Sequence, residues 1–507
     1  MGLWGSRVRI SPLRPFAAYD RPAVIDYSRD RSHFRVEPVE IAAPASVDEC
    51  RALVARARES GLGVTARGGG TGLAGQALGD GLIVDLSRHF TGISAYDAET
   101  GLIRAESGVT PAALARALEP CARAFAPYPS TGAVCTLGGM FANNAWGVNA
   151  PCFGATVDHV ESVEVVLADG TAREFGPVDP CSAKASSLER TVFERIDAQR
   201  ALILAAYPPP AIPNNAGYAL DRIARGRPWV ADAAPFNLAR LLAGSEGTLA
   251  LVTALTLRTV PAAKQRFARV LRFDSASDAV AAVPGLLTAA TIALEMLDAS
   301  VLAAWAQTNA GTTPPWAEHA GGALLIQELD PDATESLPPP VRESITLRDA
   351  EVEAAWTLRR TALESVSAIA RSDGRKPVSG FEDTAVPIAR LPEYTRAFLD
   401  LLAAEGLDCV VYGSAGMGVL YFRPFLNLDD RSDRQRFDRL QRAQAELVWS
   451  FGGTVTAKHG DGRLRSHLLR DQYPADVISI WRDIKRLFDP HGVFTAGFLA
   501  GCDPENH

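Results

Sequence analysis

The stretch Ala66-Arg67-Gly68-Gly69-Gly70-Thr71-Gly72-Leu73-Ala74-Gly75-Gln76 decides the fold of this chain. It follows an expected helix over 47–60 and a short apolar strand over 62–66. Five glycines between positions 67 and 75 leave backbone N–H groups uncovered and permit positive φ, which is how a loop wraps a phosphate. Arg67 adds a fixed positive charge, and Thr71 adds a hydroxyl. The glycine spacing fits neither Gly-x-Gly-x-x-Gly nor Gly-x-x-x-x-Gly-Lys-Ser/Thr, so neither a Rossmann nor a Walker loop is predicted.

Two further stretches of small residues have the same character. The second comprises Pro129-Ser130-Thr131-Gly132, Thr136-Leu137-Gly138-Gly139-Met140 and Asn143-Asn144-Ala145-Trp146-Gly147. The third, Gly244-Ser245-Glu246-Gly247-Thr248, opens a strand that contains Val252. A single glycine-rich loop could be a turn, but three of them joined by plausible strands predict a binding surface for a flat or charged ligand.

With these loops the chain resembles the FAD-dependent oxidoreductases of the vanillyl-alcohol oxidase and p-cresol methylhydroxylase type. Two more segments carry the resemblance, Asn214-Asn215-Ala216-Gly217-Tyr218 and Phe488-Asp489-Pro490-His491-Gly492-Val493. Within the family, the resemblance is greatest to the branch of D-lactate, glycolate and D-2-hydroxyglutarate dehydrogenases. It implies an α+β fold, with a two-part FAD-binding domain and a substrate or cap domain built from an antiparallel sheet and helices.

The expected organisation has four parts. These are a tail over 1–26, the FAD-binding domain over 27–262 with an insert at about 176–213, the cap over 263–453, and a C-terminal segment over 454–507 that returns to the flavin. Pro261-Ala262-Ala263 marks the boundary before the cap. Beyond it, strands and helices alternate in a pattern that predicts an antiparallel sheet with helices on one face.

Composition excludes several other classes of protein. The 507 residues carry a formal charge of −8 with no long run of one sign, which argues against a nucleic-acid surface. No apolar stretch approaches the length of a membrane span. Seven cysteines without a Cys-x-x-Cys motif argue against a disulfide framework or an iron–sulfur cluster. We expect a soluble, cytoplasmic protein, with a basic turn over 484–487 as one place for peripheral contact with the inner face of the membrane.

The resemblance implies one FAD per chain and distributes it over the three loops. The pyrophosphate would lie against Arg67, Gly68, Gly69, Gly70, Thr71 and Gly72, with Pro129, Ser130, Thr131, Gly132, Thr136, Gly138, Gly139 and Asn143 from the second loop. The ribityl chain and adenosine half would follow Ser245, Glu246, Gly247, Thr248 and Val252. Some relatives attach FAD covalently, but Thr71 stands at the His position and Cys135 lies one residue out of register, so we expect non-covalent FAD.

The substrate side requires a carboxylate-binding group and a base. Arg359, in Trp356-Thr357-Leu358-Arg359-Arg360, matches the carboxylate-binding arginine of the family, and a planar guanidinium suits that role. His459, in Thr456-Ala457-Lys458-His459-Gly460-Asp461-Gly462, matches the proton acceptor. The alternatives are an exposed helical arginine and a histidine that caps a helix or fills the core.

The sequence departs from its branch at the metal. Relatives usually hold a divalent ion with two histidines and a glutamate next to the catalytic histidine; here these positions carry Ser414, Tyr421 and Lys458. An ammonium repels a metal ion, so we expect no metal. We hypothesise that Lys458 takes over the electrostatic role of the metal beside His459.

These expectations combine into a function. We expect an FAD-dependent dehydrogenase that oxidises a small hydroxylated acid, a D-2-hydroxy acid in particular, and passes electrons to a quinone, an electron-transfer flavoprotein or an iron–sulfur protein. A homodimer is one expected assembly. The alternatives are a non-catalytic or electron-relaying flavoprotein subunit and a metal-independent sugar or aldonolactone oxidase.

Overall fold

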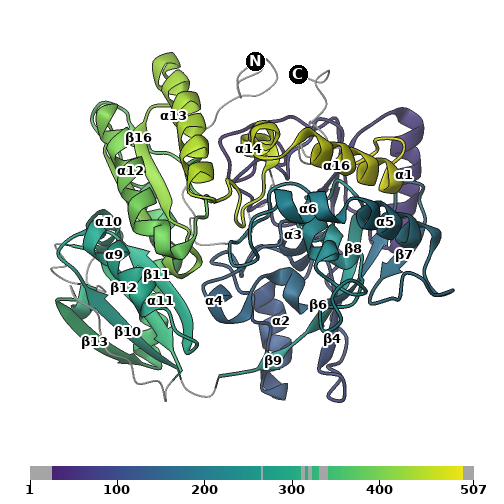
Figure 1. The fold of residues 1–507 in the computed structure, drawn as a ribbon, viewed down its shortest axis with the longest axis horizontal. Coiled ribbons are helices and arrows are strands. Elements are labelled where there is room, and N and C mark those ends of the chain that lie inside the picture. Colours follow the sequence, from purple (N-terminus) through teal and green to yellow (C-terminus); the bar gives the residue numbers. More distant parts are fainter. Residues whose placement is uncertain (1–25, 264–265, 310–313, 318–321, 331–340, 495–507) are drawn as a thin grey trace.

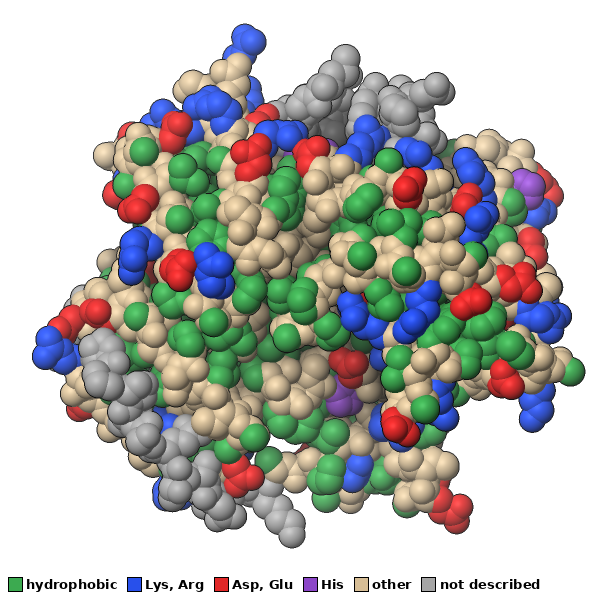
Figure 2. All heavy atoms as spheres, viewed as in Figure 1, with side chains coloured by type: hydrophobic (Ala, Val, Ile, Leu, Met, Phe, Trp, Pro, Cys, Tyr) green, Lys and Arg blue, Asp and Glu red, His purple; other side chains and the backbone are tan. Residues whose placement is uncertain are grey.

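The computed structural model describes residues 26–263, 266–309, 314–317, 322–330 and 341–494. The expected N-terminal tail up to residue 25, and the last part of the C-terminal segment, lie outside these ranges. Two bodies stand side by side in Figure 1, one around a seven-stranded sheet and one around two smaller sheets. Positive and negative side chains are interspersed over the face in Figure 2. In the described ranges, no helix has both the length and the apolar character needed to cross a bilayer.

A small parallel sheet positions the first glycine loop. Its strand order is β1-β3-β2, with β1 at Glu40–Ala42, β2 at Val64–Arg67 and β3 at Leu82–Asp85. Helix α1, Val47–Ser60, starts where Ser46 caps it by accepting the Glu49 N–H, and ends at Gly61 with φ 66°. This matches the predicted helix, and its apolar face packs on the sheet. The chain leaves β2 directly into the glycine loop.

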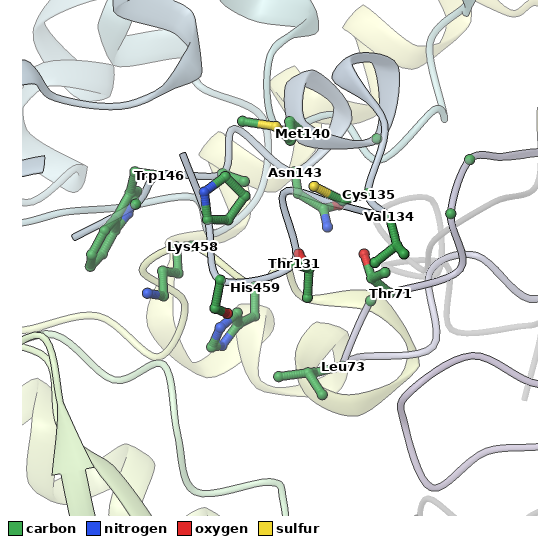
Figure 3. A pocket seen from close by; sticks show the side chains of 18 of the residues that line it. Thr71, Leu73, Thr131, Val134, Cys135, Met140, Asn143, Trp146, Lys458 and His459 are labelled. Carbon is green, nitrogen blue, oxygen red and sulfur yellow. The ribbon is translucent and has the colours of Figure 1, made fainter. Parts of the chain in front are cut away.

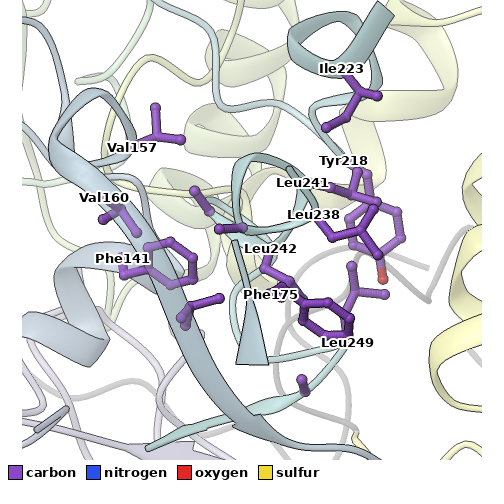
Figure 4. Close-up of a cluster of buried hydrophobic side chains, with 14 of the residues drawn as sticks. Phe141, Val157, Val160, Phe175, Tyr218, Ile223, Leu238, Leu241, Leu242 and Leu249 are labelled. Carbon is purple, nitrogen blue, oxygen red and sulfur yellow. The ribbon is translucent and has the colours of Figure 1, made fainter. Parts of the chain in front are cut away.

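An antiparallel sheet supports the second and third loops. Its order is β4-β8-β6-β7, with strands Leu102–Glu106, Leu251–Arg258, Val160–Val166 and Ala172–Phe175. The core in Figure 4 joins Phe141 of α3 (Leu137–Ala142) to Leu241 and Leu242 of α8 (Ala239–Leu242). Surrounding helices are α2 Pro111–Leu118, α5 Ser187–Ala198, α6 Arg200–Ala206 and α7 Leu220–Ala224. Helix α4, Ala150–Phe153, packs instead against the seven-stranded sheet, to whose core Ala150 belongs. Strands β5, Arg123–Ala124, and β9, Val260–Pro261, pair with each other.

The seven-stranded sheet is antiparallel throughout and has the order β13-β10-β12-β11-β15-β16-β14. Its strands are β10 Phe267–Arg272, β11 Thr291–Leu297, β12 Leu324–Leu329, β13 Glu343–Arg348, β14 Lys376–Pro377, β15 Cys409–Gly413 and β16 Tyr421–Leu426. Helices α9 Ala276–Leu286, α12 Leu391–Ala404 and α13 Arg431–Ser450 share one core with it. Helices α10 Ala299–Thr308 and α11 Ala350–Ser367 share another.

The prediction of helices on one face of this sheet was therefore wrong. Val270 belongs to the core with α10 and α11, whereas the next residue, Leu271, belongs to the core with α9, α12 and α13. Because successive strand residues point to opposite faces, strands that are apolar at consecutive positions need cover on both sides.

The C-terminal part of the chain returns to the smaller sheets. It forms α14 Gly462–Arg465, α15 Leu469–Gln472 and α16 Ala475–Phe488, which lie on the right in Figure 1. The Val493 carbonyl accepts a hydrogen bond of 2.7 Å from the Val64 N–H. Lys485, in the basic turn, donates to the carbonyls of Thr248 and Phe494 and to Asp489. Its ammonium therefore joins the third loop to the C-terminal segment.

Candidate active site

A cavity of about 320 Å³ lies where both bodies and the C-terminal segment meet. Figure 3 shows Thr71, Thr131, Val134, Cys135, Asn143, Trp146, Lys458 and His459 around it. Most of the predicted site residues line it, and these are Gly68, Gly69, Gly70, Thr71, Gly72, Pro129, Ser130, Thr131, Thr136, Gly139, Asn143, Glu246, Arg359, Lys458 and His459. Segments that are nearly 400 residues apart in sequence thus form one site.

The glycines of the first loop allow it to press against the second. A Cβ on Gly68 would lie 2.2 Å from Oγ1 of Thr136, and a Cβ on Gly69 would lie 2.1 Å from the Val134 carbonyl oxygen. Gly139 differs, because outside its chain neighbours and the backbone of its own helix, the only described atom within 4 Å of its Cβ position is Thr136 Oγ1, at 3.3 Å. Since Gly139 also lines the cavity, its missing side chain leaves room that a ligand can fill. Two facing loops with bare backbone form a cradle that fits FAD.

Arg67 does not line the cavity. Its guanidinium is buried beneath the first loop, where Nη2 donates to the Arg29 carbonyl at 2.7 Å and Nη1 donates to the Ala77 carbonyl at 3.2 Å. A Cβ on Gly70 would lie 2.5 Å from Nη2. Burial lowers the pKa of Arg67, although the negative charges of Asp30 and Asp85 act to raise it. The side chain supports the loop from behind.

The third loop enters the cavity through Glu246. This residue has φ 54°, and its Oε1 accepts the Asp461 N–H at 2.5 Å and the Gly462 N–H at 3.2 Å. Burial and, to a lesser extent, the nearby charge of Asp461 raise its pKa to about 8. Glu246 thereby joins the third loop to the segment that carries His459. The other predicted cofactor residues outside the lining are Gly132, Gly138, Ser245, Gly247, Thr248 and Val252.

Arg359 is a buried cation of the cavity wall. Its Nε donates to Glu295 Oε2 at 2.6 Å, and its guanidinium carbon lies 5.4 Å and 5.6 Å from the ring centroids of Tyr412 and Tyr421. Burial opposes the charge, but Glu295 and the tyrosines raise the pKa of Arg359 above its usual value. The alternative of an exposed helical arginine is excluded, since 7% of Arg359 is accessible.

Lys458 places its ammonium against aromatic rings. Nζ lies 4.0 Å from the Trp146 ring centroid and 5.2 Å from that of Tyr421. In the part of the chain that the structure describes, this ammonium has no ion pair or hydrogen bond. It lies next to His459 at the cavity (Figure 3). The charge is thus available to an anionic ligand.

His459 faces a buried carboxylate on one side and the cavity on the other. Its Nδ1 lies 3.2 Å from Asp383 Oδ1, and its ring centroid lies 5.6 Å from that of Tyr421. Burial holds the pKa of His459 well below its usual value, and the charges of Lys458, Arg465, Arg423 and Arg359 lower it further. A neutral imidazole at neutral pH can accept a proton.

The three substituted metal positions do not form a metal site. Tyr421 and Lys458 line the cavity beside His459, whereas Ser414 is buried outside the lining. An ammonium has no lone pair to donate, and a neutral phenol and hydroxyl are poor ligands beside it. Among the described residues, no group of three or more His, Cys, Asp or Glu side chains could hold an ion. This donor set does not fit the divalent metal that the branch usually carries.

Several wall residues were not predicted as site residues. Trp146, Tyr412 and Arg423 line the cavity, and Glu295 stands behind it. A charged residue within an apolar strand, as at Glu295 in β11 and Arg423 in β16, is the signal that could have identified them.

Comparisons with known proteins agree with this arrangement. Residues 38–176 match the family model of the FAD binding domain, and residues 263–498 match that of the C-terminal domain of FAD linked oxidases. The chain is 30% identical to D-2-hydroxyglutarate dehydrogenase of Escherichia coli strain K12, over 94% of this chain and 49% of that protein. It is 26% identical to the glycolate oxidase subunit GlcD of Bacillus subtilis strain 168, over 94% of this chain and 92% of that protein.

The chain is also similar to one further relative and to one solved structure. D-lactate dehydrogenase of Archaeoglobus fulgidus is 26% identical, over 90% of each chain. Among solved structures, alkyldihydroxyacetonephosphate synthase has a TM-score of 0.55 at 14% identity, covering 92% of this chain and 76% of that one, which shows the fold alone. The chain spans about half the length of the D-2-hydroxyglutarate dehydrogenases that it matches.

Proposed function

This chain belongs to the FAD-linked oxidases that combine an FAD binding domain with this C-terminal domain, and we propose that it is a dehydrogenase of a small D-2-hydroxy acid. The observation that carries the proposal is the placement of Arg359, Lys458 and His459 around one cavity with the glycine loops. Bound FAD would accept the hydride that leaves the carbinol carbon of the substrate.

Three side chains would bind the substrate and move its hydroxyl proton. In the described part of the chain, Glu295 engages only Nε of Arg359, which leaves both Nη groups for the substrate carboxylate. His459, neutral because of burial and its cationic neighbours, would take the hydroxyl proton. Lys458 would stabilise the negative charge that develops on the hydroxyl oxygen, in the place where relatives use a metal.

We propose that the cofactor is held without a covalent bond. The loops that line the cavity would cradle its pyrophosphate, and Ser245, Gly247, Thr248 and Val252 remain proposed contacts of the adenosine half. Thr71 lacks a ring nitrogen for attachment, and burial raises the pKa of Cys135 to about 12, which disfavours its thiolate. Precipitation with trichloroacetic acid should therefore leave a colourless pellet and yellow supernatant.

The substituted metal positions support a second candidate, a flavoprotein subunit that relays electrons without substrate oxidation. The glycolate oxidase relative is itself named a subunit. Under the first proposal, electrons pass to a quinone, an electron-transfer flavoprotein or an iron–sulfur protein. Cytoplasmic location, peripheral membrane contact and a homodimer are further expectations, which fractionation and solution mass measurements can test.

Anaerobic bleaching of the flavin distinguishes these candidates. The purified protein with bound FAD is mixed with D-2-hydroxy acids, their L enantiomers, simple alcohols, sugars and aldonolactones. Rapid bleaching by a D-2-hydroxy acid, lost in Arg359→Met and His459→Gln, is the expected result. Bleaching by sugars or lactones alone would indicate the sugar or aldonolactone oxidase, and no bleaching by any compound would favour the relay subunit.

A further inference from the structure

We propose that Asp383 is the positioning residue of this site, fixing the backbone that presents Lys458 and His459 and holding the imidazole with its proton on Nδ1. Asp383 lies in the segment that follows β14 and precedes α12, outside the cavity lining. The role in catalysis rests on the proposed function. The position of the proton on the His459 ring is independent of the proposed function.

The backbone contacts are the first observation. Three consecutive N–H groups donate to this one residue: Ala457 to the carbonyl oxygen at 2.8 Å, Lys458 to Oδ1 at 3.0 Å and His459 to Oδ2 at 2.8 Å. A carboxylate that accepts adjacent N–H groups fixes the direction of both following side chains. Lys458 and His459 therefore depend on the same carboxylate for their place at the cavity.

The ring contact is the second observation. His459 Nδ1 lies 3.2 Å from Asp383 Oδ1, but this contact does not have the geometry of a hydrogen bond, and Nδ1 has no hydrogen-bond partner among the residues that the structure describes. A carboxylate at this position favours the tautomer with Nδ1 protonated, because an unprotonated Nδ1 would point a lone pair at a negative oxygen. The other nitrogen, Nε2, then keeps the free lone pair that a base requires.

The backbone of Asp383 is the third observation. Its φ of 82° lies in the region that favours glycine, and the residue is fully buried. A non-glycine residue held there costs free energy, so the surrounding contacts must hold it in place. The contacts of the Asp383 carboxylate explain why an aspartate, and not a glycine, stands at this position.

The surrounding charges allow the carboxylate to ionise. Burial raises the pKa of Asp383 to about 7, while Arg465, the N–H groups of His459 and Lys458, and the Lys458 ammonium oppose that rise. Arg465 Nη1 lies 3.9 Å from Oδ2. The charged and titratable groups around the His459 ring are Asp383, Tyr421, Lys458, Arg359, Arg423 and Arg465.

The test reads the tautomer directly. The protein with bound FAD is labelled with ¹⁵N-histidine, and His459→Gln identifies the His459 signals among those of the eight histidines. We expect the Nδ1–H tautomer in the wild-type protein at pH 7.5. In Asp383→Asn we expect loss of that preference. A wild-type His459 protonated on Nε2 would overturn the proposal, even if the variant failed to fold.

Asp298→Asn is the matched control. Asp298 is also buried and also accepts two backbone N–H groups, from Val301 at 2.9 Å and Val411 at 2.6 Å, but it does not contact His459. It should leave the His459 tautomer unchanged. With a bleaching substrate in hand, Asp383→Asn should lower the bleaching rate at least about a hundredfold with FAD retained. An unchanged tautomer and rate in Asp383→Asn would show that the residue is only structural.

Discussion

At the scale of single residues, Lys458 is the charged residue among the three substituted metal positions. Its ammonium is one of the charges that hold the pKa of His459 below the usual value. Removing a neighbouring cation makes imidazolium less unfavourable, so the pKa of His459 should rise. Lys458→Met should therefore move the acid limb of the kcat/KM profile to higher pH and lower kcat/KM at pH 7 by about tenfold.

The control for this variant is Lys376→Met, which removes an exposed lysine from β14. Its pH profile should match that of the wild-type protein. Lys458→Arg should retain most of the shift in pKa, because it keeps the charge. A Lys458→Met enzyme with an unmoved acid limb and normal kcat/KM would show that the ammonium has no part in the reaction.

The same substitution bears on metal content. With Tyr421 and Lys458 at two of the expected ligand positions, the site places an ammonium where a metal ion needs a neutral or anionic donor. Elemental analysis of the dialysed protein should find no stoichiometric zinc, manganese or iron, and chelators should leave FAD binding and bleaching unchanged. One tightly bound ion per chain, lost together with activity on chelation, would contradict this reading.

At the scale of elements, Gly139 in α3 gives the sharpest test of the cradle. Glycine inside a helix costs about 1 kcal/mol relative to alanine, so its presence suggests a close approach by a ligand. Gly139→Leu should abolish FAD binding with little change in secondary structure, because Gly139 lines the cavity and its Cβ position has only Thr136 Oγ1 nearby outside its own helix. Absorbance of the purified protein and circular dichroism measure the two effects.

Ala115→Leu, on the exposed face of neighbouring α2, is the control and should bind FAD normally. Gly69→Leu is a poorer test, because its side chain would collide with the Val134 carbonyl and disturb the fold itself. If Gly139→Leu binds FAD with wild-type affinity, the cavity beside α3 is not the cofactor site.

Elements were predictable where local pattern determines them. Helix α1 was predicted with its observed bounds, since the Ser46 cap and the Gly61 stop are local signals. The segments over 93–97 and around Ala385 also have a pattern that favours strands, but they form only isolated bridges, because pairing depends on distant partners such as Val419 and Thr454. The prediction that helices cover only one face of the seven-stranded sheet was wrong for a related reason. The residue pattern of a strand shows that both faces of its sheet are apolar, but it does not show which helices pack on each face.

At the scale of the whole molecule, the glycine loops were recognisable as ligand-binding because their chemistry lies in consecutive residues. The cavity wall was not, because it depends on sheet register. Glu295, Tyr412 and Arg423 come from three different strands and meet only when β11, β15 and β16 align. Asp383 reaches His459 across 76 positions of sequence. Long-range contacts of this kind leave no trace in a local motif.

The joining of both bodies at one cavity leads to a last prediction. FAD in contact with the glycine loops and with Arg359 and Tyr421 would bind the folded chain only, so it should stabilise both bodies together. At a hundredfold excess over Kd this stabilisation is about 2.7 kcal/mol, and the protein loaded with FAD should unfold a few degrees higher than the cofactor-free protein. Scanning fluorimetry with FAD measures the shift, and Gly139→Leu should show none. ADP, which keeps the diphosphate but lacks the flavin, should give a smaller shift through the proposed pyrophosphate cradle and the third loop. If FAD at saturation moves only one of two separate transitions, the cofactor contacts one body and the cap closes without it.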